Sequence, residues 1–126
     1  MKAIRFEKFG GPEVLEYKDI EISKPGPKEV LVKNFSVGLN YIDVYHRTGL
    51  YPIELPSGLG LEASGVVEEI GSEVSLFKVG DRVSHASAPI SGYSEKQIMP
   101  EEKLVTVPEG ISDCLLYTSP SPRDLP

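Results

Sequence analysis

Apolar and polar residues alternate along this chain in short runs that glycine and proline interrupt. The runs are rich in β-branched residues, which favour strands, and they cover residues 30–37, 64–70 and 104–107. Turn-forming residues separate the runs, with 12 glycines and 11 prolines spread through the 126 residues. Short strands at this spacing predict a mainly β fold, a small barrel or a sandwich.

One segment departs from the β pattern. Asn40 precedes residues 41–47, and Gly49 follows them. Asparagine can accept hydrogen bonds from the free amides of a first helical turn, and glycine tolerates the left-handed conformation in which helices often end. Asp43 falls in the first turn, where a carboxylate is favourable. We therefore expect a short helix that packs against the sheet, because two turns are not stable alone.

Length and charge narrow the class of protein. The chain is long enough for one domain, and its formal net charge of −6 argues against a nucleic-acid partner. No apolar run approaches the roughly 20 residues of a membrane span, and charges interrupt the N-terminus where a signal peptide would be apolar. A cytoplasmic protein without a membrane span is expected. The single cysteine, Cys114, can form neither an internal disulfide nor a thiolate cluster.

Five blocks follow one another along the chain, at residues 9–15, 37–43, 47–52, 56–65 and 79–83. Together and in this order they resemble the N-terminal half of the medium-chain dehydrogenases/reductases. Within that superfamily the chain is similar to the zinc-free NADPH:quinone oxidoreductase branch, the zeta-crystallin-like enzymes. The resemblance implies a GroES-like, partly open β-barrel with one or two short helices. It also implies a Rossmann domain in the full-length enzyme that this chain lacks, since no G-x-G-x-x-G fingerprint occurs.

The resemblance also bears on metal binding. In zinc alcohol dehydrogenases the aligned blocks carry a ligand cysteine and a ligand histidine where this chain holds Asn40 and Leu61. The histidines of this chain, His46 and His85, lie elsewhere in the sequence. Zinc needs three or four Cys, His or carboxylate ligands. We therefore expect no zinc, and we expect His85 to be structural or solvated.

Candidate catalytic groups follow from the same resemblance. The amide of Asn40 and the hydroxyls of Tyr45 and Tyr51 would face the cleft where nicotinamide and acceptor meet. Hydrogen-bond donors there can stabilise the oxygen that gains charge when hydride arrives, while the hydride chemistry belongs to the cofactor. By resemblance, NADPH would be contacted from this domain by Tyr41, Ile42, Asp43, Val44 and Tyr45.

Plainer roles remain open for several of these side chains. Tyr45 could simply cover the barrel, Asn40 could only cap the helix, and Asp43 could serve only the electrostatics of the first turn. Glu62 matches a family carboxylate near the zinc. Without a metal, a structural partnership with a cation such as Arg82 is expected for it.

The implied acceptor is a quinone or another conjugated carbonyl compound, and the implied full-length parent is a homodimer. Two alternatives stay open. One is a metal-free enoyl reductase of the same superfamily, and the other is a GroES-like binding module without catalysis. Because the half that holds most of the NADPH is absent, we expect the present chain alone to be inactive.

The last residues break with the family pattern. Residues 114–124 read as the conceptual translation of a transposase-type sequencing adapter, although a genuine Pro/Ser-rich disordered tail has a similar composition. We therefore expect a GroES-like domain over residues 1–113, followed over residues 114–126 by a tail that is adapter-derived and non-native or disordered.

Overall fold

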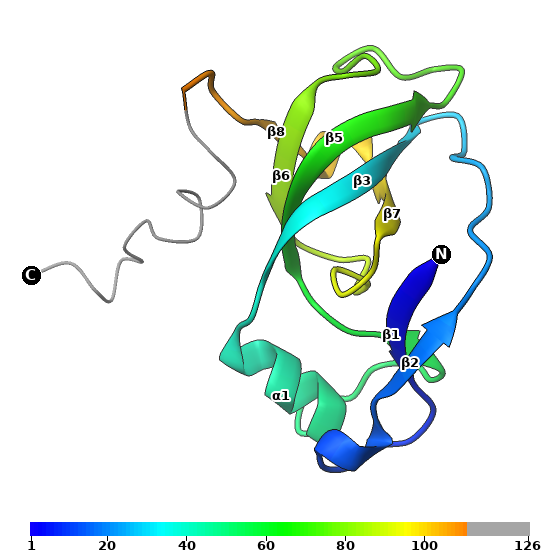
Figure 1. The fold of residues 1–126 in the computed structure, drawn as a ribbon, viewed down its shortest axis with the longest axis vertical. Helices are drawn as coiled ribbons and strands as arrows, with labels where there is room; N and C mark the ends of the chain where they lie inside the picture. The colour runs from blue at the N-terminus through cyan, green and yellow to red at the C-terminus, as the bar shows by residue number, and fades with distance from the viewer. Residues whose placement is uncertain (111–126) are drawn as a thin grey trace, which may run out of the picture.

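Two antiparallel sheets and a short helix make up the computed structural model, which describes residues 1–110 (Figure 1). The larger sheet has the strand order β7-β3-β5-β6-β8, and the smaller sheet has the order β2-β1-β4. The strands are β1 (Lys2–Phe6), β2 (Glu16–Asp19), β3 (Glu29–Gly38), β4 (Ser57–Gly58), β5 (Glu62–Ile70), β6 (Arg82–Ala86), β7 (Lys96–Pro100) and β8 (Val105–Thr106). The helices are α1 (Tyr41–Thr48) and the 3-10 turns η1 (Pro12–Val14) and η2 (Glu101–Lys103).

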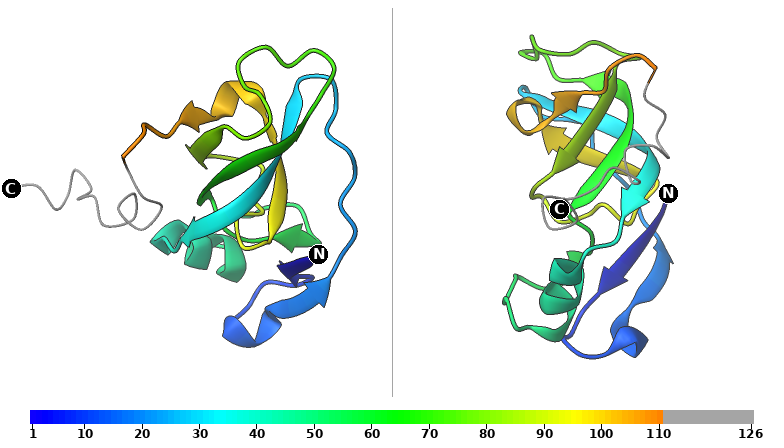
Figure 2. Two further views of the ribbon diagram at one scale, coloured as in Figure 1. Left: turned by 45° about the horizontal axis from the view of Figure 1, so that its top comes forward. Right: turned by 90° about the vertical axis from the view of Figure 1, so that its left-hand side faces the viewer.

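The smaller sheet and α1 lie together at one end of the larger sheet (Figure 2). A single backbone bridge between Ala3 and Ser94 links β1 to the segment that leads into β7. In the larger sheet β7 and β8 are the outer strands and do not pair with each other. The sheet therefore stays open along one side, as a partly open barrel requires.

Each sheet has its own apolar core. Alternating residues of the central strands point to one side, as period-2 patterning predicts. The larger cluster contains Val30, Val32, Val67, Val83, Met99 and Leu104. The smaller cluster lies beside the three-stranded sheet and contains Phe6, Val14 and Leu59, with Tyr93 packed against it.

The mainly β architecture predicted from the sequence, with a partly open barrel and short helices, is confirmed. The runs at 30–37 and 64–70 lie within β3 and β5, whereas only residues 105–106 of the third run pair, in the short strand β8. The helix runs one residue further than predicted, to Thr48, and Gly49 ends it at φ 86°. Within residues 1–110 no helix is long and apolar enough to cross a membrane. The predicted boundary at residue 113 and the tail lie outside the described residues.

Candidate functional site

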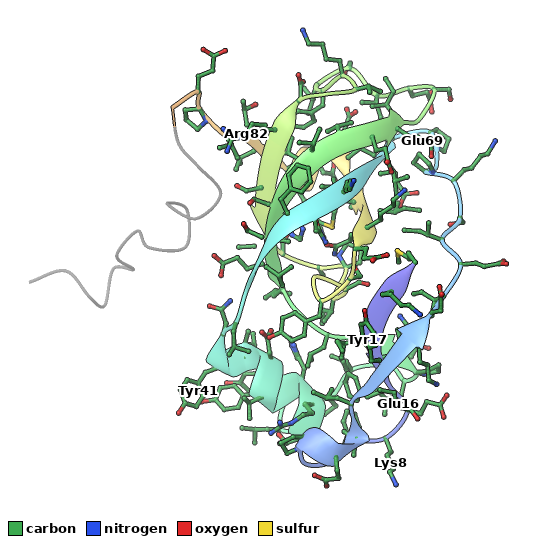
Figure 3. The ribbon with its side chains drawn as sticks, viewed as in Figure 1. Lys8, Glu16, Tyr17, Tyr41, Glu69 and Arg82 are labelled. Carbon is green, nitrogen blue, oxygen red and sulfur yellow. The ribbon has the colours of Figure 1, made fainter. Side chains whose placement is uncertain are left out.

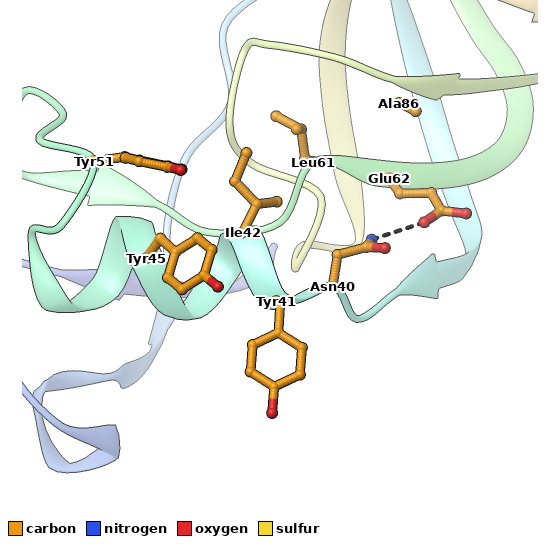
Figure 4. A pocket seen from close by; sticks show the side chains of 8 residues that line it. All are labelled: Asn40, Tyr41, Ile42, Tyr45, Tyr51, Leu61, Glu62 and Ala86. Atoms are coloured by element: carbon orange, nitrogen blue, oxygen red, sulfur yellow. Dashed lines mark hydrogen bonds between the residues drawn. The ribbon is translucent and has the colours of Figure 1, made fainter. Parts of the chain in front are cut away.

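An open pocket of about 390 Å³ lies where the start of α1 meets the start of β5 and the end of β6 (Figure 4). These three segments converge because β3 leads directly into α1 and because Glu62 pairs with Ala86 across β5 and β6. The pocket is lined by Asn40, Tyr41, Ile42, Tyr45, Tyr51, Leu61, Glu62 and Ala86.

Three tyrosines form the aromatic wall of the pocket. The rings of Tyr45 and Tyr51 meet edge to face, with centroids 5.2 Å apart, and Tyr41 lies 6.3 Å from Tyr45. The left-handed residue Gly49 turns the chain back, so that the backbone N–H groups of both Gly49 and Tyr51 donate to the carbonyl of Tyr45. This local turn places Tyr51 over the helix, and Tyr51 and Tyr41 remain 52% and 78% exposed.

The polar wall consists of Asn40 and Glu62. Asn40 Nδ2 donates to Glu62 Oε2 at 2.7 Å, across 22 residues of sequence. The amide thus takes the place of the cation that we expected beside Glu62. Arg82 is opposite Val66, four residues along β5 from Glu62, and lies at the end of β6 that is far from α1 (Figure 3).

The start of α1 carries the cap that the sequence predicted. Asn40 occupies the N-cap position, in extended conformation, and forms a capping box with Asp43. In the Asp43 half of this box, Asp43 Oδ2 accepts from the backbone N–H of Asn40 at 3.1 Å. Because a cap uses the side-chain oxygen of asparagine as the acceptor, Asn40 Nδ2 stays available to donate to Glu62.

Asp43 also binds a residue that the sequence did not indicate, Tyr93. The Tyr93 hydroxyl donates to Asp43 Oδ2 at 2.5 Å, and the carboxylate is 1% exposed. Burial, and then the hydrogen bond to Asp43, raise the pKa of Tyr93 well above its ordinary value. Tyr93 lies 50 residues from Asp43 in a segment without a regular pattern, so no local signal pointed to it.

The structure brings together most, but not all, of the predicted site residues. Asn40, Tyr41, Ile42, Tyr45 and Tyr51 all line the pocket. Asp43 and Val44 do not line it, since Asp43 is buried on the opposite side of the helix turn and faces Tyr93. The other lining residues are Leu61, Glu62 and Ala86.

Neither histidine lies among the lining residues. His85 is buried in β6, where its Nε2 is 3.1 Å from Gln97 Oε1. Burial lowers the pKa of His85, and the hydrogen bond to Gln97 partly opposes that shift. His46 is buried on α1. The structural role expected for His85 agrees with this placement.

The donor groups of the pocket do not fit a catalytic zinc. Among residues 1–110 no group of three His, Cys, Asp or Glu side chains could hold a metal ion. Within the lining set Glu62 is the one carboxylate, and beside it lie the amide of Asn40 and the hydrocarbon side chain of Leu61. Zinc sites in proteins use cysteine, histidine and carboxylate ligands.

Comparison with known families identifies the fold as a GroES-like domain. Residues 26–109 match the model of the alcohol dehydrogenase GroES-like domain. The chain belongs to this family. The GroES-like domain described here thus carries its aromatic pocket on a scaffold that is shared with oxidoreductases.

Similar proteins include quinone oxidoreductases and a 2-haloacrylate reductase. A quinone oxidoreductase of Pseudomonas aeruginosa is 58% identical over 111 residues, which are 87% of this chain and 34% of that protein. The structure of Escherichia coli quinone oxidoreductase complexed with NADPH superposes with a TM-score of 0.87 at 42% identity, covering 90% of this chain and 35% of the other. A 2-haloacrylate reductase of a Burkholderia species is 39% identical over 108 residues, 82% of this chain and 32% of that protein.

These coverages limit what is shared. The GroES-like domain spans about a third of the length of the curated relatives that it matches. The likeness therefore concerns one part of those proteins.

Proposed function

We propose that this GroES-like domain forms the acceptor side of the active site of a zinc-independent NADPH:quinone oxidoreductase. The observation that carries the proposal is the pocket itself, in which three tyrosines and an oriented amide surround an apolar floor of Ile42 and Leu61. Support also comes from relatives that are described as quinone oxidoreductases, one of them in complex with NADPH.

Asn40 is the first of the proposed catalytic groups. Its side-chain nitrogen carries two hydrogens, and the bond to Glu62 uses one of them. The second can donate to a carbonyl oxygen of the acceptor. Because Glu62 fixes the amide, the donor needs little reorganisation when negative charge develops on that oxygen, which is the condition for effective electrostatic stabilisation.

Tyr45 and Tyr51 supply hydroxyl donors on the other wall. A quinone takes up a hydride and a proton to become a hydroquinone, and the ring becomes aromatic in the process. The proton can reach the oxygen from an exposed phenol such as that of Tyr51 or from the water that contacts it. Tyr45 and Tyr51 meet edge to face, so a planar acceptor ring could stack on the face of one of these two rings.

The same wall fits a flat cofactor ring. NADPH, when bound, supplies the hydride. The proposal has Tyr41, Ile42 and Tyr45 contact the nicotinamide from this domain, and their position in the pocket lining supports it. Asp43 and Val44 would act behind this wall by holding the helix. The proposal assigns the pyrophosphate to a Rossmann domain of a longer protein, in which residues 1–113 are the GroES-like domain.

Further features of the longer protein follow only from the resemblance. We propose that it is a cytoplasmic homodimer. The present chain alone should not reduce quinones with NADPH, because it lacks the part that holds most of the cofactor. Robust turnover by residues 1–126 would refute this division into two parts.

A second candidate function is reduction of an activated carbon–carbon double bond. The similarity to a 2-haloacrylate reductase favours it. In such a reaction the hydride adds to the alkene carbon, and the charge moves to the conjugated carbonyl oxygen, which the same donors would stabilise. The two functions therefore differ in the acceptor and share the site.

Steady-state oxidation of NADPH by the longer protein tests both candidates. The proposal predicts a higher kcat/KM with a planar quinone than with 2-chloroacrylate or an enoyl thioester. It also predicts that Asn40→Ala lowers kcat by about 10²-fold, the usual cost of one oxyanion donor. Tyr17→Phe is the matched control, because Tyr17 is 72% exposed and does not line the pocket. A preference for the alkene would establish the second candidate, and no turnover with either would favour a GroES-like binding module.

A further inference from the structure

Tyr93 is held firmly by its own backbone. Its N–H donates to the carbonyl of Leu59 at 2.8 Å, and its carbonyl accepts from the N–H of Ile4 at 2.8 Å. Its ring packs against the smaller apolar cluster, which contains Phe6 and Leu59. The residue is thus fixed to β1 and to the segment that connects β4 with β5.

The hydroxyl of Tyr93 extends this fixed frame to α1. It donates to Asp43 Oδ2, which also accepts from the backbone N–H of Asn40. The other oxygen, Asp43 Oδ1, is buried and has no hydrogen-bond partner within the described part of the chain. A buried carboxylate is costly unless donors satisfy it. Loss of the phenol would leave Asp43 with one donor and would favour a shift of the helix start toward water.

The ring of Tyr93 also contacts Gly60, just before the start of β5. It lies so close to Gly60 that a Cβ atom there would be 2.6 Å from Tyr93 Cδ1. Gly60 directly precedes Leu61 and Glu62, two of the lining residues. Tyr93 therefore contacts residues at both α1 and the start of β5, and the 2.7 Å bond between Asn40 and Glu62 joins these two elements.

We propose that Tyr93 is a positioning residue for the pocket: its ring and hydroxyl set the separation of α1 from the start of β5, and so orient the amide of Asn40. It does not line the pocket, so it acts through Asp43 and Gly60. The catalytic meaning of this role rests on the function proposed above. The positioning itself does not.

The test uses the 126-residue chain and its Tyr93→Phe variant, with ¹⁵N NMR of the side-chain amide of Asn40. In the parent chain this amide should exchange slowly and be shifted by its bond to Glu62. A hydrogen bond to a charged group contributes about 1.5–3 kcal/mol. Tyr93→Phe should therefore accelerate exchange of the Asn40 amide by about tenfold to hundredfold, while backbone exchange in β3 and β5 changes by less than about threefold.

Tyr17→Phe is the matched control, since it removes an exposed phenol, and should leave the Asn40 signals unchanged. Asp43→Asn is a second variant that keeps an acceptor for Tyr93 and for the N–H of Asn40. It should give a smaller change than Tyr93→Phe.

Three results would overturn the proposal. They are unchanged Asn40 signals in Tyr93→Phe, a larger change in Asp43→Asn than in Tyr93→Phe, and global unfolding of Tyr93→Phe, which would make the hydroxyl a general stabiliser. Since the NMR readout needs no turnover, a failure of quinone reduction in the longer protein would not affect the positioning proposal. Likewise, failure of the positioning proposal would not affect the proposed quinone reduction.

Discussion

Replacing Gly60 with alanine should destabilise the fold more than the same change at Gly80 or Gly110. Those two glycines are also left-handed, but nothing lies close to a Cβ atom built on them. Gly60 has φ 100°, and a Cβ atom there would lie 2.6 Å from Tyr93 Cδ1 and 2.9 Å from Tyr93 N. The ring could tilt to relieve the first contact. The backbone nitrogen cannot easily move, because it donates to the carbonyl of Leu59.

Gly80 separates the two parts of this effect. It has φ 97°, nearly the same as Gly60, but nothing lies within 4 Å of a Cβ built there. Gly80→Ala should therefore cost only the backbone term, about 1–2 kcal/mol. Gly60→Ala should cost that term and an overpacking term of about 1–3 kcal/mol, which gives about 2–5 kcal/mol in total.

Urea unfolding of the two variants, followed by far-UV circular dichroism, measures the difference. With a slope of about 2 kcal/mol per M, an extra 2 kcal/mol corresponds to a midpoint about 1 M lower for Gly60→Ala than for Gly80→Ala. Equal midpoints would refute the reasoning, because they would mean that Tyr93 does not crowd position 60. The comparison thus tests a contact on which the wall of the pocket depends.

Three further predictions concern the core, the alkaline limit of stability and metal binding. Met99→Ala, at a fully buried position, should lower the free energy of unfolding by about 2–5 kcal/mol, whereas Leu76→Ala, at a 61% exposed position, should change it by less than about 0.5 kcal/mol in the same urea titration. Because the folded-state pKa of Tyr93 is raised, the contribution of Tyr93 to stability is complete below the unfolded pKa of about 10 and is lost as pH rises further. Absorbance at 295 nm should therefore show one late-titrating tyrosine that is absent from Tyr93→Phe. Persistence of the late titration in that variant would contradict the assignment. The paired substitution of Asn40→Cys and Leu61→His should create, with Glu62, a three-ligand zinc site that isothermal titration detects in the variant and not in the parent chain; equal binding by both would show that the wild-type pocket already accepts zinc.

Local sequence patterns were sufficient to predict the elements that form without distant partners. Alternation of β-branched residues predicted β3 and β5, and the Asn40 and Gly49 signals predicted both ends of α1 within a residue. The third predicted strand, residues 104–107, was overestimated in length, since only residues 105–106 form the strand β8 beside β6. Edge pairing depends on tertiary contacts that an apolar run does not encode.

The candidate site was predictable only as far as its residues were close in sequence or part of a resembled block. Asn40, Tyr45 and Tyr51 lie within a dozen residues of one another, and the structure gathers them in one pocket. The prediction that Arg82 is the partner of Glu62 was wrong, because cross-strand register and not charge decides which groups meet. Tyr93 was missed because its contact with Asp43 joins segments 50 residues apart.

The central claim is that the pocket on this domain promotes hydride transfer to a quinone without zinc. Its most direct test is NADPH-dependent quinone reduction by the longer protein, measured at 340 nm before and after prolonged treatment with 1,10-phenanthroline, together with the zinc content of the same sample. We predict turnover that the chelator does not change and a zinc content far below one ion per chain. Stoichiometric zinc, with activity that the chelator abolishes and added zinc restores, would contradict the account.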